Sequence, residues 1–574
     1  MIVHRLPWLR FVLSVGIGVA WALSFPRAGI AGFAWVVPGL LVAVTAGAPS
    51  GLAYRVAYVG SATHFLISLS WLRFIPFPAG AYAAWFALSL FLAIFPPLWV
   101  LACWQFARRL GSAAASRNRP DAFGVVETLV AMPWSRLNLL FVLAAAAWVT
   151  WEMLVTRLFG GFPWNLLGAS QYRMVPLIQL ASATGVYGVS FLVVWFSVSL
   201  VTAVAFLAHA PDRPSLWRRP LVFPSLMVVA ATGGGFLAVL SDGPAPRRLE
   251  VALIQPNIPQ TVIFDPDATT NRFETLYRLT DQALATRPDL VLWPEASLPG
   301  GLGPEDFERL AARIREAKVW MIFGSDDVEE VPPSAPGLEP TYRAFNAAFL
   351  LDPQGKVVAR YRKRRLVMFG EYIPFAKWLP FLRRLAPIGD GFHPGDRPEP
   401  FRMESLDVTT STLICFEDNF PQEARAHATA AVDFLVNLTN NAWFGEDSAQ
   451  WQHAVNAVFR TIETGLPLVR ACNNGLSCWI DPRGRIHSAR VAEGKNIYGA
   501  GFEVVSLAFG QRRSTLFQRF GDAFGWGCVV ATLAFLRFRN PPDERRPSPG
   551  VADTAPANGL PPARSDDAGA GPRP

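Results

Sequence analysis

The sequence predicts a multi-pass α-helical membrane bundle of eight transmembrane helices that carries an extramembrane α/β sandwich domain. Eight apolar runs are each about long enough to cross a hydrocarbon core of about 30 Å as a helix. Only 17% of the 574 residues are charged, whereas about a quarter are charged in an ordinary soluble domain. Between residues 246 and 511, short apolar runs alternate with amphipathic segments, which is typical of buried strands alternating with helices.

The predicted spans divide the chain into four parts. The first run has no convincing cleavage site and six more spans follow it, so we expect it to be retained rather than removed as a signal peptide. We expect an N-terminal bundle at 1–245, an α/β domain at 246–511, a C-terminal transmembrane helix at 512–539, and a disordered tail at 540–574 that is rich in Pro, Ala, Asp and Arg. The runs cover roughly residues 9–25, 28–47, 52–72, 80–106, 138–157, 186–208, 221–240 and 517–536.

Basic residues predict the orientation of the bundle, because Lys and Arg collect in the cytoplasmic loops of membrane proteins. They precede the first run, lie between the fourth and fifth and between the sixth and seventh runs, and follow the eighth. The residues are Arg5, Arg10, Arg108, Arg109, Arg117, Arg119, Arg136, Arg213, Arg218, Arg219, Arg537, Arg539, Arg545 and Arg546. We therefore expect both termini in the cytoplasm and the α/β domain outside it. This clustering in short loops also argues against a nucleic acid as the partner behind the net charge of +8.

The α/β domain is predicted from its own pattern of strands and helices. A polar turn at 352–355 between two apolar runs predicts a β-hairpin. Helices are predicted at about 267–286, 304–317 and 448–463, and strands at 251–254, 290–293, 319–323, 347–351, 357–359, 411–415, 432–438 and 468–471.

A cysteine ends one of these strands. In the run Ser411–Asp418, Cys415 comes directly after apolar residues and just before two acidic ones. A strand fixes a thiol and the following loop exposes it, which suits a nucleophile. The alternative is a buried cysteine that only packs, because Cys is among the most buried residue types.

Two further strand ends carry charged groups. Glu295 follows an apolar strand and Pro294, where partial burial would suit a general base; the alternative is a solvated loop glutamate. Lys363 lies in a basic run that leads into a turn-forming, partly apolar segment, so this lysine can point inward while its neighbours stay in water. A fixed ammonium beside a thiol stabilises a thiolate or an oxyanion. Glu295, Lys363 and Cys415 thus form a coherent set for attack on a carbonyl.

Other motifs are less specific. The turn at Asn440–Gly445 follows a strand and reads equally as an ordinary Asn/Gly turn. The aromatic loop 160–165 is either a lipid entrance or a belt anchor at the membrane interface. Cys472 and Cys478 could pair on the outer side of the membrane. With 7 His and no H-E-x-x-H motif, we expect no metal site.

These stretches together resemble a known family. The segments around Glu295, Lys363 and Cys415 look like the Glu-Lys-Cys motifs of the nitrilase superfamily, and their position between seven spans and an eighth is similar to bacterial apolipoprotein N-acyltransferases. The resemblance runs from about residue 9 to 537 and implies a nitrilase-like αββα sandwich. Supporting stretches are 161–164, 255–260, 441–445 and 470–475.

The resemblance implies an activity. The enzyme would take an acyl chain from a phospholipid, typically phosphatidylethanolamine, as a thioester on Cys415 and pass it to the N-terminal lipidated cysteine of an apolipoprotein. Glu295 would accept the thiol proton and Lys363 would stabilise the intermediate. Further active-site positions by the same resemblance are Glu371, Phe416, Glu417 and Trp443. It implies no cofactor and no metal, and we expect a monomer in the bacterial inner membrane with the catalytic domain on the periplasmic side.

The chain departs from the family pattern at four places, namely Arg365, Met368, Phe416 and Phe264. None of these removes a catalytic group, so we expect them to affect efficiency or lipid preference. Two other functions are weighed against acyl transfer. A membrane-anchored amidase would resolve the thioester with water, although eight spans exceed what anchoring requires. A lipid-binding scaffold would not need Glu295, Lys363 and Cys415 intact.

Overall fold

The computed structural model describes most of the chain. Residues up to Leu536 form one compact unit. The predicted tail at 540–574 and Phe264 lie outside the described residues. The described residues are 7–111, 122–241, 246–262, 269–298, 303–332, 340–376, 378–385, 388, 391–488, 491, 497–510 and 512–537.

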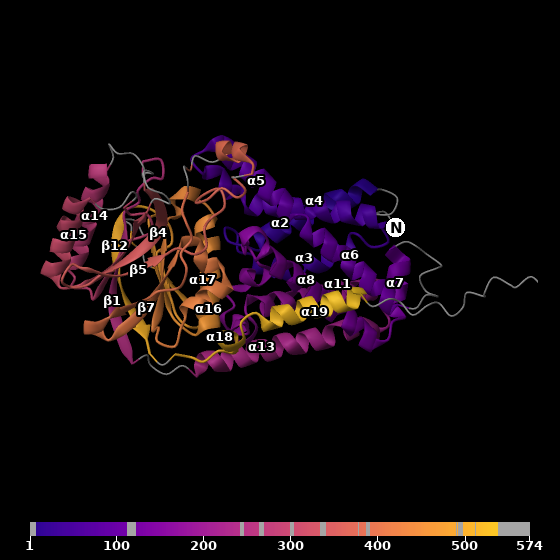
Figure 1. Cartoon of the computed structure of the whole chain (residues 1–574). Coiled ribbons are helices and arrows are strands. Elements are labelled where there is room, and N and C mark those ends of the chain that lie inside the picture. Colours follow the sequence, from indigo (N-terminus) through magenta and orange to yellow (C-terminus); the bar gives the residue numbers. More distant parts are fainter. Residues whose placement is uncertain are drawn as a thin grey trace, which may run out of the picture. The chain divides into compact units, whose positions relative to one another are not determined.

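Helices make up the first half of the unit and its C-terminal end (Figure 1). Their apolar side chains pack into one extended core, in which Trp21, Trp99 and Trp148 are almost fully buried. The helices are α2 (Pro7–Leu23), η1 (Ala31–Trp35), α3 (Val37–Ala43), α4 (Ser50–Ser68), η2 (Ser70–Phe74), α5 (Pro78–Leu92), α6 (Phe95–Leu110), α7 (Ala122–Val130), α8 (Trp134–Val155), η4 (Leu158–Gly160), η5 (Leu167–Gln171), α9 (Val175–Ile178), α10 (Ala181–Thr184), α11 (Val186–His209), α12 (Pro214–Arg218), η6 (Arg219–Leu221), α13 (Val222–Leu240), α18 (Leu516–Phe520) and α19 (Ala523–Arg537).

Four helical segments among the described residues are long and apolar enough to cross a membrane: Pro78–Leu110, Trp134–Val155, Val186–His209 and Pro214–Leu240. Two other predicted spans, α2 and α19, are shorter apolar helices. The number of eight spans is therefore not established by helix length.

Two predicted runs are interrupted, and proline accounts for both. In the run 28–47, a 3₁₀ turn precedes α3, which has Pro38 in its first turn and spans only 7 residues. In the run 80–106, α5 ends at Leu92 and α6 begins at Phe95, with Pro96 and Pro97 in its first turn. Proline is tolerated in the first turn of a helix but not in its interior, so an apolar run that contains it forms two helices.

The α/β domain contains two six-stranded sheets. The first has the order β12-β1-β2-β3-β4-β5, with β1, β2 and β3 parallel; the second has the order β11-β10-β9-β8-β7-β6, with β7, β8 and β9 parallel. The strands are β1 (Arg247–Gln255), β2 (Leu290–Leu292), β3 (Trp320–Val331), β4 (Thr341–Leu351), β5 (Val357–Arg362), β6 (Pro400–Met403), β7 (Val408–Ile414), β8 (Phe434–Thr439), β9 (Leu468–Cys472), β10 (Cys478–Ile480), β11 (Ile486–Ser488) and β12 (Gly501–Phe509).

The sheets form the two central layers of an αββα sandwich. Alternate residues of the strands point to opposite faces, so Val251 and Leu253 of β1 enter a core shared with Val436 of β8, between the sheets. The opposite face of the first sheet packs on α14 (Thr269–Leu284) and α15 (Pro304–Ala317). On the second sheet, Leu435 packs with residues of α16 (Pro421–His427) and α17 (Ala449–Thr464). Figure 1 shows the two helix pairs on opposite sides of the strands.

The predicted α/β elements match this domain closely. The helix predicted at 304–317 is α15, and the predicted hairpin is the antiparallel pair β4 and β5. Strand β3 is longer than predicted and continues to Val331. Short 3₁₀ turns complete the domain at η7 (Pro380–Leu385), η8 (Glu404–Leu406), η9 (Cys415–Asn419) and η10 (Asn441–Phe444).

Candidate active site

Cys415 lies at a sharp turn between β7 and η9. Its φ is +51°, a left-handed conformation that is uncommon for a residue with a side chain and that persists where the surroundings hold it. Here the amide of Asn437 and the ring of His453 hold the Cys415 carbonyl, at 3.1 and 3.2 Å. The hydroxyl of Thr439 donates to the Cys415 sulfur at 3.2 Å. Residues of β8 and α17 thus hold this turn and its thiol.

Lys363 is buried between two carboxylates. The side chain is 1% exposed, and its Nζ lies 3.1 Å from Oε1 of Glu295 and 2.9 Å from Oε1 of Glu371. The amide of Asn346 donates to the same two oxygens, at 2.8 and 2.7 Å. A buried ammonium is stable only when it is paired in this way.

Two backbone amides complete the carboxylate pair. Asn440 donates its N–H to Oε2 of Glu295 at 2.9 Å, and Val367 donates its N–H to Oε2 of Glu371 at 2.8 Å. Both acids therefore have partners on each oxygen. Glu295 follows β2 and Asn440 follows β8, so the site lies where strands of the two sheets end.

The charges of this cluster set the protonation states. Burial raises the pKa of Glu295, but the ammonium of Lys363 and hydrogen bonds from Cys415, Asn346 and Lys363 outweigh it and hold the pKa below its usual value. Burial lowers the pKa of Lys363, but Glu295 and Glu371 raise it well above the usual value. Burial and the charge of Glu295 raise the pKa of the Cys415 thiol. At neutral pH, the cluster is therefore a carboxylate, an ammonium and a neutral thiol.

Glu417 joins the turn at Cys415 to the loop after Lys363. One carboxylate oxygen accepts from the backbone N–H of Ile414 at 2.8 Å. The other accepts from the Tyr361 hydroxyl and from the N–H groups of Arg364 and Arg365, at 2.8, 2.7 and 3.1 Å. Burial raises the pKa of Glu417 to about 7, although these donors oppose the shift. These hydrogen bonds fix the geometry of the site, and none of them joins Glu417 to the Cys415 thiol.

Asp418, the next residue, anchors α17 to the same turn. Its carboxylate pairs with Nε2 of His453 at 2.9 Å and with the guanidinium of Arg470. All three side chains are buried. Burial raises the pKa of Asp418, but His453 and Arg470 lower it below the usual value. The histidine that binds the Cys415 carbonyl is itself fixed by its hydrogen bond with Asp418.

Phe416 belongs to an aromatic cluster with the loop at 160–165. Its ring centroid lies 6.1 Å from that of Phe162, 6.4 Å from that of Trp164 and 5.1 Å from that of Phe420. Trp164 is 5% exposed, so the loop is not a simple anchor at a lipid surface. It packs directly beside the residue that follows Cys415.

Gln452 of α17 connects the helical half to this region. Its carbonyl oxygen accepts from the indoles of Trp71 and Trp164, at 3.1 and 2.8 Å. Its amide donates to the backbone carbonyls of Pro26 and Ser68, at 2.8 and 3.2 Å. One side chain therefore binds segments from before α3, from the end of α4, from η2 and from the 160–165 loop.

The structure brings together most of the predicted site residues. Glu295, Lys363, Glu371 and Cys415 form one cluster, and Glu417 braces it. Trp443 lies in η10, which follows the Asn440 turn. Lys363 points inward as predicted, while Arg364 and Arg365 pair with Glu423. Cys472 and Cys478 are both free and do not form the disulfide considered above.

Sequence reasoning missed three residues that position the site: Asn346, Gln452 and His453. Asn346 lies in β4, one residue before the strand predicted at 347–351. The Asn346 side chain is 6% exposed, and its burial against two acids leaves no signal in the sequence. Gln452 and His453 were included only in a predicted helix.

Two protein-family models match separate parts of this chain. The model of the apolipoprotein N-acyltransferase N-terminal domain matches residues 17–199. The carbon-nitrogen hydrolase model matches residues 250–500.

Among curated proteins, apolipoprotein N-acyltransferase from Geobacter metallireducens is 35% identical over 93% of this chain and 96% of that protein. The enzyme of the same name from Bradyrhizobium diazoefficiens is 32% identical over 62% of this chain and 66% of that protein. Among solved structures, an amidase from Nesterenkonia sp. is 20% identical, with a TM-score of 0.32, over 50% of this chain and 97% of that chain.

Proposed function

Because the chain belongs to the apolipoprotein N-acyltransferase family, we propose that it moves an acyl chain from a membrane phospholipid to Cys415 and from there to an apolipoprotein. The acceptor is the α-amino group of the N-terminal diacylglyceryl-cysteine. Phosphatidylethanolamine is the proposed donor. This is a ping-pong scheme, in which one site serves two bulky substrates in turn.

In the first half-reaction, the carboxylate of Glu295 takes the thiol proton as the Cys415 sulfur attacks the ester carbonyl of the phospholipid. The tetrahedral oxyanion forms beside the ammonium of Lys363, whose charge stabilises it. The carbon–oxygen bond then breaks, and the leaving alkoxide of the lysophospholipid takes the proton from Glu295. The acyl chain remains on Cys415 as a thioester.

In the second half-reaction, the neutral α-amine of the apolipoprotein attacks the thioester carbonyl. Glu295 receives a proton from the amine, the carbon–sulfur bond breaks, and the thiolate recovers that proton. The products are the N-acylated apolipoprotein and the free thiol. Glu371 and Asn346 do not bond with the acyl group in this scheme; they keep Lys363 and Glu295 in place.

One observation carries this proposal: Nζ of the buried Lys363 lies 3.1 Å from Oε1 of the buried, ionised Glu295, beside the neutral thiol of Cys415. A base that is already ionised and an ammonium that is already desolvated need little reorganisation when the thiol attacks.

We also propose the topology that the charge pattern predicts. Eight spans would place residues 246–511 on the periplasmic side of the inner membrane and both termini in the cytoplasm. The short helices α2, α3 and α19 would then cross together with their neighbours, rather than as isolated long helices. A monomer suffices, because Glu295, Lys363 and Cys415 all come from one chain.

The test is incubation of the purified full-length protein with phosphatidylethanolamine and a synthetic diacylglyceryl lipopeptide, followed by mass spectrometry of the peptide. We expect the mass of one acyl chain to be added at the peptide N-terminus. Release of free fatty acid with an unmodified peptide would instead identify a hydrolase and contradict the proposal.

A further inference from the structure

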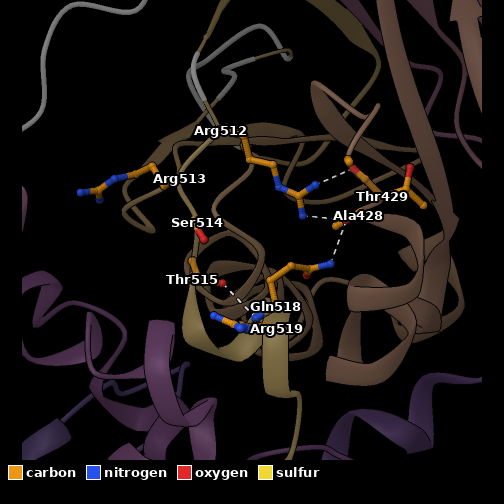
Figure 2. Close-up of a pocket in the computed structure, with 9 residues that line it drawn as sticks. Ala428, Thr429, Arg512, Arg513, Ser514, Thr515, Gln518 and Arg519 are labelled. Atoms are coloured by element: carbon orange, nitrogen blue, oxygen red, sulfur yellow. Dashed lines mark hydrogen bonds between the residues drawn. The ribbon is translucent and has the colours of Figure 1, made fainter.

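A buried histidine lies outside the catalytic cluster, at the end of α16. His427 is the last residue of this helix, and its side chain is fully buried. The carbonyl of the next residue, Ala428, accepts from the guanidinium of Arg512 at 2.6 Å and from the amide of Gln518 at 2.9 Å, as Figure 2 shows. These bonds fix the end of α16, and His427 with it, within the α/β domain.

A chain of hydrogen bonds connects His427 with Glu417. Nδ1 of His427 lies 2.9 Å from the Ser411 hydroxyl oxygen, and Nε2 lies 3.2 Å from the Tyr361 hydroxyl oxygen. The Tyr361 hydroxyl in turn donates to Oε1 of Glu417 at 2.8 Å. All four side chains are at most 1% exposed. A bond that is lost from this chain is therefore not replaced cheaply by bulk water.

One arrangement of protons satisfies every donor of the chain. Within the described part of the protein the Ser411 hydroxyl has no acceptor other than Nδ1 of His427, so it donates there. Burial and the charge of Arg364 lower the pKa of His427 to about 3, so the ring is neutral and carries its one proton on Nε2. Nε2 then donates to the Tyr361 oxygen, and the Tyr361 proton is directed at Glu417.

This arrangement fits an ionised Glu417. A carboxylate only accepts, and its two oxygens receive the Tyr361 hydroxyl and three backbone N–H groups. A protonated Glu417 would direct its proton at one of these donors. Burial raises the pKa of Glu417 to about 7, and the charge of Lys363 opposes that shift together with the donors. The other charged groups beside the chain are Glu423 and Arg364, which face Tyr361.

Helix α16 reaches the loop after Lys363 by two routes. Glu423, one helical turn before His427, pairs with the side chains of Arg364 and Arg365. The second route runs from His427 through Tyr361 to Glu417, which binds the backbone N–H groups of the same two arginines and that of Ile414, the residue before Cys415. The ionisation of Glu417 therefore decides whether this loop and the Cys415 turn are held together.

We propose that His427 is a positioning residue, which acts through Tyr361 to keep Glu417 ionised and so keeps the loop of Lys363 against the turn of Cys415. Its consequence for acyl transfer rests on the proposed function. A neutral Glu417 would release one of its N–H donors, and Lys363 would then be held less firmly beside the thiol.

The test is a pH titration of the full-length protein in neutral detergent by infrared difference spectroscopy. The carboxylic acid band that is absent from Glu417→Gln reports the protonation of Glu417. His427→Leu should raise the midpoint of this band by about half a pH unit, because the Tyr361 bond to the carboxylate loses the donor that strengthens it. His427→Gln, whose amide still donates to Tyr361, should keep the wild-type midpoint. The control His487→Leu changes an exposed histidine 3.6 Å from Asp481 and should also keep it.

The rate of thioester formation on Cys415 is measured on the same samples with phosphatidylethanolamine alone, which avoids the titration of the acceptor amine. In His427→Leu this rate should fall about twofold near neutral pH and recover at higher pH, as the ionised fraction of Glu417 does. A loss that is equal at every pH would mean that His427 only supports the fold, and would overturn the proposal. A wild type that forms no thioester would count against the proposed function alone, because the infrared midpoint is measured without lipid.

A second variant interrupts the same chain at another residue. Tyr361→Phe removes the bond to Glu417 itself, so its midpoint should rise at least as far as that of His427→Leu. Adding His427→Leu to Tyr361→Phe should cause no further rise, because His427 acts only through Tyr361. The proposal is overturned by a wild-type midpoint in Tyr361→Phe, by a further rise in the double variant, or by an equal rise in His427→Gln or in the control.

Discussion

At the scale of single residues, the site depends on a small number of buried polar contacts. Lys363 would be costly to bury alone, and the two carboxylates beside it would repel each other without it. Asn346 solves part of this problem, because its one amide group donates to both carboxylates at 2.8 and 2.7 Å. Glu295 could be predicted because it follows an apolar strand, and Lys363 because its basic run leads into a partly apolar segment, whereas Glu371 was expected only from the family resemblance. Asn346 could not, since nothing in a single sequence shows which face of a strand meets two acids.

Asn346→Leu should slow acyl transfer by roughly tenfold to a hundredfold, the equivalent of a lost hydrogen bond to a charged group. The Asn346 amide lowers the pKa of Glu295, so its loss should raise that pKa and move the acid limb of the kcat/KM profile to higher pH. The measurement is kcat/KM for the lipopeptide across the pH range.

The matched control is Asn138→Leu, which changes an asparagine of α8 that donates only to the Trp134 carbonyl. A slow Asn346→Leu enzyme with an unmoved acid limb would mean that Asn346 supports the fold rather than the ionisation of Glu295.

At the scale of elements, α17 links the catalytic turn to the helical half. Gln452 and His453 are neighbours in sequence, yet Gln452 binds the 160–165 loop and His453 binds the Cys415 carbonyl. The amphipathic pattern predicted this helix well. The pattern did not predict that the polar residues of α17 are buried, because the helices that cover them are far away in sequence. The proline breaks in two apolar runs were not predicted either, because hydropathy depends on the composition of a run and not on whether its residues can continue a helix.

Gln452→Leu should destabilise the protein and weaken its use of phospholipid. The change leaves the buried indole N–H groups of Trp71 and Trp164 without their acceptor, at a cost of about 1–3 kcal/mol each. We expect a lower Tm in detergent, and a higher KM for phospholipid in the variant molecules that remain folded, because the aromatic loop beside Phe416 loses its anchor.

Gln450→Leu is the matched control, since Gln450 is a buried glutamine of the same helix that binds the Asn441 and Gly445 carbonyls instead. Equal changes in the KM for phospholipid in both variants would contradict a specific role for Gln452.

At the scale of the whole molecule, the αββα domain and the helical half share one hydrophobic core. Residues of α16 and α17 belong to the same buried cluster as the tryptophans of α2, α6 and α8. The two-part organisation and the layers of the α/β domain follow from the change in hydrophobic pattern near residue 246. The shared core could not be predicted from that pattern, because contacts between distant segments leave no periodic signal in either segment. This organisation suits substrates whose acyl chains stay in the bilayer while their reacting groups reach Cys415.

The most direct test of the account is the intact mass of the protein after incubation with phosphatidylethanolamine alone. Wild type should gain one acyl chain that hydroxylamine removes, because a thioester is cleaved by this reagent, and the mass should return to its original value when lipopeptide is added. Cys415→Ala should remain unmodified and inactive while it still inserts into the membrane. A wild-type protein that transfers the acyl chain without ever carrying it, or a Cys415→Ala variant that still transfers it, would contradict the central claim.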